Sequence, residues 1–181
     1  TAVATLNALS EPYIEWHRGD PMELLPSGVE TVVTVGLFKP AMRKFDDIEL
    51  RIIEREACPP PSQEGVAVSM FTPAEAKGAM EAADVIFITG STLLYGGLNR
   101  YLDLAPADAP VILVGATASF CPEPLFAAGV DVVAGAVVSD PDRVSRAIEA
   151  GACGSGLHTS GVEKTYVTPE PIETTVFGQD G

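Results

Sequence analysis

Long apolar runs recur along the chain, and each is followed by small residues and then by sequence typical of a helix. A run of Val, Ile and Leu without polar alternation is typical of a strand in a parallel sheet, because helices cover both faces of such a strand. Three of these junctions read TVVTVGLFKP, VIFITGSTLL and VILVGATASF. The pattern predicts strands at residues 31–35, 49–53, 85–88, 111–114, 130–133 with a continuation at 136–138, and 163–167.

Helical sequence fills most of the connections between these strands. Thr72, Pro73 and Glu75 form a capping-box pattern, with Thr as N-cap, Pro as the first helical residue and Glu as the third. Asp140 is a second N-cap signal, and Gly129 is typical of the residue that ends a helix. The helices are expected at residues 2–9, 39–45, 73–83, 93–104, 123–128 and 141–150.

The alternation of strands and helices with short connections predicts an α/β fold. We expect a Rossmann-like, open, mostly parallel sheet of five or six strands with helices on both faces. The Rossmann-like domain is expected at residues 29–167, after a remnant or linker of a preceding domain at 1–28 and before a flexible tail at 168–181. The expected core residues are Val33, Val35, Ile52, Val85, Ile86, Ile88, Val111, Ile112, Leu113, Val132 and Val133.

Composition limits the class of protein. The 181 residues are 46% hydrophobic, which is enough for one domain with its own core. The net charge is −14, and the 11 basic residues form no stripe, so we expect neither a nucleic-acid nor a membrane partner. No apolar run approaches the roughly 18 residues that span a bilayer, and the N-terminus lacks a signal-peptide pattern. A cytoplasmic protein is expected, whose acidity serves solubility or attracts a cation.

The turns after the strands are the candidate ligand site, because in an open parallel sheet they all leave from the carboxyl edge. Thr89, Gly90, Ser91 and Thr92 follow one strand and open a helix. Free backbone N–H groups and hydroxyls there favour an anion, and the alternative is simple N-capping by Ser91 or Thr92. A side chain at Gly90 is expected to damage ligand binding more than stability.

Gly36 and Glu54 form a second candidate pair. Glu54 follows a predicted strand about 18 residues after Gly36, and nucleotide-binding α/β folds place an acidic residue at about this distance on ribose hydroxyls. The pattern GxGxxG is absent, however, and Phe38 and Pro40 stand where small residues would be needed. We therefore expect no NAD, and Glu54 is left to bind an amine, another polar group or a metal, or to pair with a nearby arginine.

The third turn contributes Gly115 and Thr117, and Cys121 follows it. A thiol at a helix start has a lowered pKa, so a reactive thiol, a metal ligand and a packed side chain all stay open for Cys121. The three cysteines are odd in number and lack CxxC spacing, so neither a disulfide nor a zinc knuckle is expected. His17 and His158 are expected in loops, and His158 could close over the carboxyl edge.

Several segments resemble those of the heavy-metal chelation domain family of bacteria and archaea, and they follow one another in the same order as in that family. They are ATLNAL, VVTVGLFKP, LRIIERE, ADVIFITGSTLLYGGLNRYLDLA and VILVGATASFCPEPLFAAGVDVVAGAVVSDPDRVSRAI. The resemblance covers about residues 5–167 and implies a Rossmann-like domain preceded by an enolase-N-terminal-like domain, most of which would be missing here. It implies a cleft lined by Gly36, Phe38, Pro40, Glu54, Thr89, Gly90, Ser91, Thr92, Gly115 and Thr117.

Three hypotheses on function stay open. The first is a small-ligand or metal-binding protein with its site at the carboxyl edge, where Glu54, Cys121 and His158 are the candidate ligands of a divalent or heavy metal ion. The second is an enzyme acting on a phosphorylated or amino-acid-like small molecule, although no nucleophile–base pair is visible. The third is a subunit whose site is completed by a partner, either in a homo-oligomer or as the missing domain.

Overall fold

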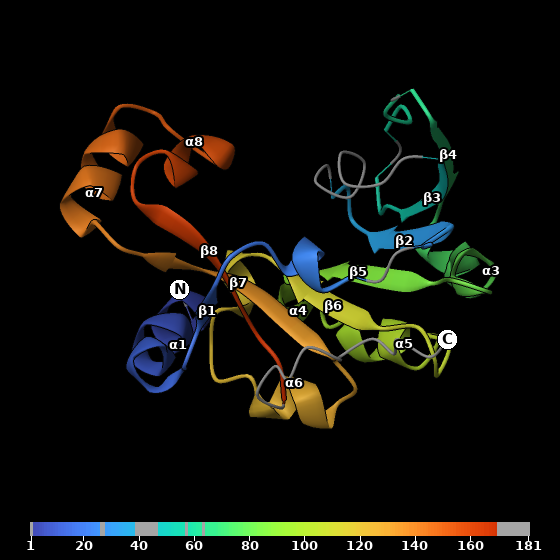
Figure 1. Cartoon of the computed structure of the whole chain (residues 1–181), viewed down its shortest axis with the longest axis horizontal. Helices are drawn as coiled ribbons and strands as arrows, with labels where there is room; N and C mark the ends of the chain where they lie inside the picture. Colours follow the sequence, from blue (N-terminus) through green and yellow to red (C-terminus); the bar gives the residue numbers. More distant parts are fainter. Residues whose placement is uncertain (1, 26–27, 39–46, 57, 63, 170–181) are drawn as a thin grey trace.

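The computed structural model describes residues 2–25, 28–38, 47–56, 58–62 and 64–169. Within these residues eight strands form one sheet in the order β1-β8-β7-β6-β5-β2-β3-β4 (Figure 1). The strands β2 to β7 pair in parallel, whereas β8 is antiparallel to both β7 and β1. The strands are β1 (His17–Arg18), β2 (Thr31–Val35), β3 (Ile48–Ile53), β4 (Val66–Phe71), β5 (Val85–Thr89), β6 (Val111–Val114), β7 (Val132–Val138) and β8 (Val162–Val167).

The order of the parallel strands is that of a doubly wound fold. From β2 the chain adds β3 and β4 on one side, then returns and adds β5, β6 and β7 on the other. The order therefore reverses between β2 and β5, as in the Rossmann order 3-2-1-4-5-6. Figure 1 shows β3 and β4 at one end of the sheet and α7 (Pro141–Glu149) and α8 (Ser155–His158) at the other. The predicted fold class, an α/β protein with an open, mostly parallel sheet, is confirmed.

Short helices cover the sheet and bury its two faces in separate clusters. One cluster joins Val33 and Ile86 to the helices α3, α5 and α6, and the other joins Val32 and Phe87 to Met22 of the 3₁₀ helix η2. All of the expected core residues are buried. The remaining helical elements are α1 (Ala2–Ser10), η1 (Glu11–Tyr13), η2 (Pro21–Leu24), η3 (Pro73–Glu75), α3 (Ala76–Met80), α4 (Thr92–Tyr95), α5 (Leu98–Leu102), η4 (Ala116–Ala118) and α6 (Glu123–Ala127).

Two edge strands account for a sheet that is larger than the expected five or six strands. β4 reads VAVSMF and is half-buried along most of its length, and its apolar run was not recognised as a strand. β1 consists of two exposed polar residues, which carry no hydrophobic pattern. It pairs with β8 and lies within residues 1–28, so part of the expected linker belongs to the sheet, and the domain boundary at 28 stays a prediction.

The helices are shorter than expected where glycine interrupts them. The helix expected at 93–104 is divided into α4 and α5, because Gly96 adopts a left-handed φ of +71° and ends α4. The predicted caps are confirmed: the Glu75 carboxylate accepts from the N–H of Thr72 at 2.8 Å, and the Asp140 carboxylate accepts from the N–H of Arg143 at 2.9 Å. The helix expected at 39–45 lies outside the described residues.

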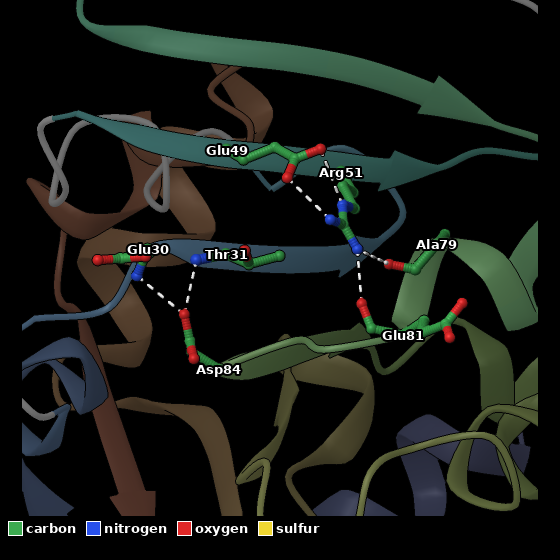
Figure 2. A network of polar contacts seen from close by, with 7 residues as sticks. All are labelled: Glu30, Thr31, Glu49, Arg51, Ala79, Glu81 and Asp84. Carbon is green, nitrogen blue, oxygen red and sulfur yellow. Dashed lines mark hydrogen bonds and ion pairs between the residues drawn. The ribbon is translucent and has the colours of Figure 1, made fainter.

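A polar network around Arg51 ties β3 to the end of α3 (Figure 2). The Arg51 guanidinium pairs with Glu49 at 2.8 Å and donates to the carbonyl oxygens of Ala79 and Glu81. It therefore satisfies carbonyls that the end of a helix leaves without partners. The hydrogen bond from Arg51 also holds the pKa of the Glu49 carboxyl below its usual range. The Asp84 carboxylate satisfies backbone N–H groups at the start of β2. It accepts hydrogen bonds from the N–H groups of Glu30 and Thr31.

Candidate functional site

A cleft of about 820 Å³ opens at the carboxyl edge of the sheet. Its base is formed by the last residues of four strands: Val35 of β2, Ile53 of β3, Thr89 of β5 and Val114 of β6. The cleft therefore spans the reversal of strand order between β2 and β5, where open α/β sheets bind ligands. Its volume lies within the range of about 300–1,000 Å³ that is common for small-molecule sites.

The three predicted turns meet at this cleft. The turns after β2 and β5 touch, since a Cβ atom built on Gly36 would lie 3.0 Å from Cγ2 of Thr89. The chain leaves β2 and β6 through Gly36 and Gly115 with φ values of +85° and +120°, which favour glycine. The predicted residues that line the cleft are Gly36, Phe38, Glu54, Thr89, Ser91, Thr92 and Gly115.

Gly90 and Thr117 lie against each other outside the cleft lining. A Cβ atom on Gly90 would come within 2.5 Å of Oγ1 of Thr117 and 3.2 Å of the backbone nitrogen of Ala118. The neighbour that requires glycine here is therefore the protein itself and not a ligand. A side chain at Gly90 is therefore expected to cost stability as well, and the expectation that it would damage binding more than stability stays a prediction. Pro40 lies outside the described residues.

The backbone N–H groups of the turn glycines are already engaged. Those of Gly36, Gly90 and Gly115 donate to Ile53, Val114 and Ala134 at 2.7–2.9 Å and so continue the ladder of the sheet. The helix after β5, α4, has only four residues. These glycine N–H groups are therefore not free to bind an anion, and the anion site expected at the turn after β5 stays a prediction. The turn also offers the hydroxyls of Thr89 and Ser91, whose oxygens lie 2.8 Å apart.

Glu54 is fixed at the end of β3 by backbone contacts. Its carboxylate accepts from the N–H of Leu37 at 3.3 Å and from the N–H of Arg55 at 2.8 Å. Glu54 therefore ties the first turn to the neighbouring strand and lines the cleft, half-buried. Within the described residues it forms no ion pair with an arginine. Its carboxylate keeps lone pairs that can accept from an amine or a hydroxyl of a ligand.

Sequence reasoning missed the aromatic and basic wall of the cleft. The Arg55 guanidinium carbon lies 4.3 Å from the ring centroid of Tyr95, and both residues line the cleft with Tyr101. Arg100 lines it as well, and its Nη2 donates to the carbonyl of Pro73 at 2.6 Å. One signal was available in the sequence, since Arg55 directly follows Glu54 at a predicted strand end.

Residues 20–167 match the sequence model of a family, DUF364, which is described as "Putative heavy-metal chelation". The chain belongs to this family. It is 28% identical over 148 residues to an uncharacterised protein of Methanocaldococcus jannaschii, a match that covers 78% of this chain and 55% of the relative. This chain therefore spans about half the length of that curated relative.

Two solved structures of DUF364 proteins with unknown function share the fold. The structure from Pyrococcus horikoshii has a TM-score of 0.73 at 22% identity and covers 92% of this chain and 66% of its own. The structure from Desulfitobacterium hafniense has a TM-score of 0.63 at 22% identity, with 85% and 59% covered. At this identity the likeness establishes the α/β fold alone. No helix within the described part of the chain is long and apolar enough to cross a membrane.

The description of DUF364 directs attention to metal ligands. In the part of the chain that the structure describes, no three His, Cys, Asp or Glu side chains gather closely enough to hold a metal ion. Glu54 lines the cleft, whereas Cys121 and His158 do not. The three candidate metal ligands are therefore not brought together in this DUF364 chain.

Of the three alternatives for Cys121, the packed side chain is the one that the structure excludes. Cys121 is exposed and stands before α6, with its Sγ donating to Oε2 of Glu123 at 2.9 Å. That hydrogen bond raises the pKa of the thiol, because the neighbouring negative charge disfavours a thiolate. The lowered pKa expected from the helix start is therefore wrong.

Both histidines lie in regular elements rather than in loops. His17 belongs to β1, where its ring stacks on Tyr166 with centroids 5.6 Å apart. His158 ends α8, and its Nδ1 lies 3.0 Å from the carbonyl oxygen of Val162. Each imidazole therefore has a local structural contact at the β8 side of the sheet.

Proposed function

We propose that this chain binds a small anionic or zwitterionic molecule in the cleft at the carboxyl edge of its sheet. The observation that carries the proposal is the position of an 820 Å³ cleft across the reversal of strand order, lined by two carboxylates, those of Glu54 and Glu56, and by two guanidinium groups. Glu54 offers acceptors for an amine or hydroxyl, and Arg55 and Arg100 offer donors for an anion. The hydroxyls of Thr89 and Ser91 supply further polar contacts at the base of the cleft.

A metal ion is expected in the cleft only when the small molecule is bound there as well. The description of DUF364 as a heavy-metal chelation family supports a metal, but a heavy metal is usually held by several protein ligands. Among the described residues the cleft offers mainly oxygen atoms, with Glu54 as the fixed carboxylate. We therefore expect a metal to be held chiefly by oxygens, including those of the bound molecule.

A second candidate is a site completed by another chain or domain. This chain covers only 55% of the length of its curated relative. Two large hydrophobic side chains of the cleft, Leu37 and Tyr95, are 40% and 66% exposed, and exposed apolar residues gathered at a site favour a partner surface. On this hypothesis the ligand binds the isolated chain weakly.

A thermal-shift experiment with a cleft-filling variant tests the proposal. The panel consists of AMP, aspartate, citrate, inorganic phosphate, Mg²⁺ and Zn²⁺. A ligand at 100 times its Kd stabilises a folded protein by about 2.7 kcal/mol, which corresponds to a Tm increase of about 5–11 °C for a chain of this size. We expect such an increase from at least one organic anion or zwitterion.

Gly97→Leu is the variant that locates the effect. Gly97 lines the cleft, and its added Cβ would make an ordinary contact of 3.5 Å with the Tyr101 ring. The variant should keep its Tm without ligand and lose the ligand-induced increase. The matched control is Gly78→Leu on α3, where a Cβ meets nothing within 4 Å. Stabilisation by metals alone, or an unchanged response in Gly97→Leu, would contradict the proposal.

A further inference from the structure

In the part of the chain that the structure describes, the two arginines of the cleft form no ion pair with an acidic residue. Within the described residues, ion pairs join Arg18 to Glu163, Arg51 to Glu49 and Lys164 to Asp20. Arg55 and Arg100 take part in none of these pairs, although the chain has 25 acidic residues and 11 basic ones. The cleft lining also contains the carboxylates of Glu54 and Glu56, so its formal charges balance. Guanidinium groups without an ion-pair partner nevertheless keep N–H groups that can donate to an anion.

Both guanidinium groups are held in place by uncharged neighbours. Tyr95 lies against the Arg55 guanidinium at 4.3 Å from the ring centroid, so the ring covers one face and leaves the N–H groups at the edge for a ligand. Arg100 uses one N–H of Nη2 for the Pro73 carbonyl, and a guanidinium carries five. Both side chains are exposed, and each of these contacts restricts a guanidinium group, which reduces the entropy it loses when a ligand binds.

Arg100 and the ring of Phe38 belong to opposite faces of the sheet. Arg100 lies on α5 beside Tyr101, which is buried in the cluster of α3, α5 and α6. Phe38 packs on the other cluster, with its ring centroid 5.3 Å from that of Phe87. A molecule lying across the sheet edge would therefore meet guanidinium groups on the α5 side and an aromatic ring on the other side.

We propose that Arg55 and Arg100 form the anion-binding end of the cleft and hold a carboxylate or phosphate whose apolar, ring-shaped body lies toward Phe38. Guanidinium groups match the geometry of both anions and form charge-assisted hydrogen bonds with them. They are the strong donors of this cleft, since the N–H groups of the turn glycines are engaged within the sheet. The inference rests on the proposed function and specifies its ligand class.

Isothermal titration calorimetry with simple probes tests the inference. Phenyl phosphate and benzoate carry the two candidate anions on the same ring, and benzyl alcohol is the uncharged counterpart. We expect at least one of the two anions to bind the wild-type chain and benzyl alcohol to bind much more weakly. Arg55→Gln and Arg100→Gln should each weaken the anion about tenfold or more, because a hydrogen bond to a charged group is lost.

Three further variants complete the design. Arg100→Lys keeps the charge, so it should retain more affinity than Arg100→Gln. Such a difference between the two variants shows that the loss of affinity comes from the lost charge and not from a loss of folding. Phe38→Ala should weaken phenyl phosphate more than inorganic phosphate. The control is Arg146→Gln on α7, outside the cleft lining, which should bind as wild type.

The outcomes separate this inference from the proposed function. A tenfold loss in the Arg55 and Arg100 variants, with phenyl phosphate or benzoate as the preferred probe, supports it and identifies the anion. An anion that binds wild type and both glutamine variants equally, but not Gly97→Leu, overturns the inference and leaves the proposed function standing. Equal losses in Arg146→Gln, or no binding of either anion to wild type, also overturn it.

Discussion

The Glu123 carboxylate is the hydrogen-bond partner of the Cys121 thiol. The thiol donates to this carboxylate, and the contact raises the pKa of Cys121, so less thiolate is present near neutral pH. We predict that Glu123→Gln increases the rate of Cys121 alkylation by iodoacetamide several-fold at constant pH. The rate is measured by mass spectrometry of the alkylated peptide over time.

The same digest contains its own control. Cys153 is also exposed and follows α7, so its alkylation rate should be the same in wild type and in Glu123→Gln. An equal rate for Cys121 in both proteins would show that the carboxylate does not govern the thiol in solution. A joint increase at Cys121 and Cys153 would instead indicate a general loosening of the fold.

Central and edge strands of the sheet should differ sharply in their contribution to stability. Ile86 of β5 is fully buried between β2 and β6. Ile86→Ala removes apolar contacts and leaves a cavity, which should lower the free energy of unfolding by about 2–5 kcal/mol. The measurement is urea denaturation followed by circular dichroism, and a cost near zero would contradict the position of β5.

Met70 of the edge strand β4 is the comparison within the same sheet. It is half-buried and pairs with Ile52 on one side only. Met70→Ala should therefore cost clearly less than Ile86→Ala, because a half-exposed site loses less buried area and can relax. Equal costs would mean that β4 is as enclosed as the centre of the sheet.

The elements that the sequence predicts well are those that are buried and therefore rich in apolar residues. β2, β5 and β6 are buried on both faces and consist mainly of Val, Ile and other apolar residues, so their position and parallel pairing were predictable. β1 and β4 form through hydrogen bonds with one neighbour, which hydrophobic pattern does not report. The division between α4 and α5 depended on the conformation of Gly96, because a glycine within a helical pattern can continue the helix or end it.

The candidate site was predictable only as far as topology determines it. Parallel strands place their turns at one edge, so the meeting of Gly36, Thr89 and Gly115 followed from strand order alone. Arg55 and Arg100 reach the cleft through the packing of α5 and the stacking on Tyr95, and neither contact has a sequence pattern. The assembly of charge in the cleft is therefore a property of the whole molecule and not of a motif.

The excess of negative charge should govern how the whole molecule responds to salt. The chain carries −14, and exposed ion pairs such as Arg18–Glu163 contribute about 0–1 kcal/mol each, too little to offset general repulsion. Screening with NaCl should therefore raise the Tm, by about 2–4 °C for each kcal/mol of repulsion removed. A Tm that falls with NaCl would mean that attraction between charges dominates in the folded state.

The double variant Arg55→Gln/Arg100→Gln separates screening from chloride binding in the cleft. If NaCl acts by screening, the Tm of this variant rises with salt as much as that of wild type, because its net charge is even more negative. If chloride stabilises wild type by binding the guanidinium groups, the increase is lost in the variant.

The affinity of wild type for a carboxylate or phosphate probe should fall over the same titration, since salt weakens the attraction between the arginines and the anion. One salt series would thus stabilise the fold and weaken the site, and a joint increase of both would contradict the assignment of the arginines as its anion-binding end.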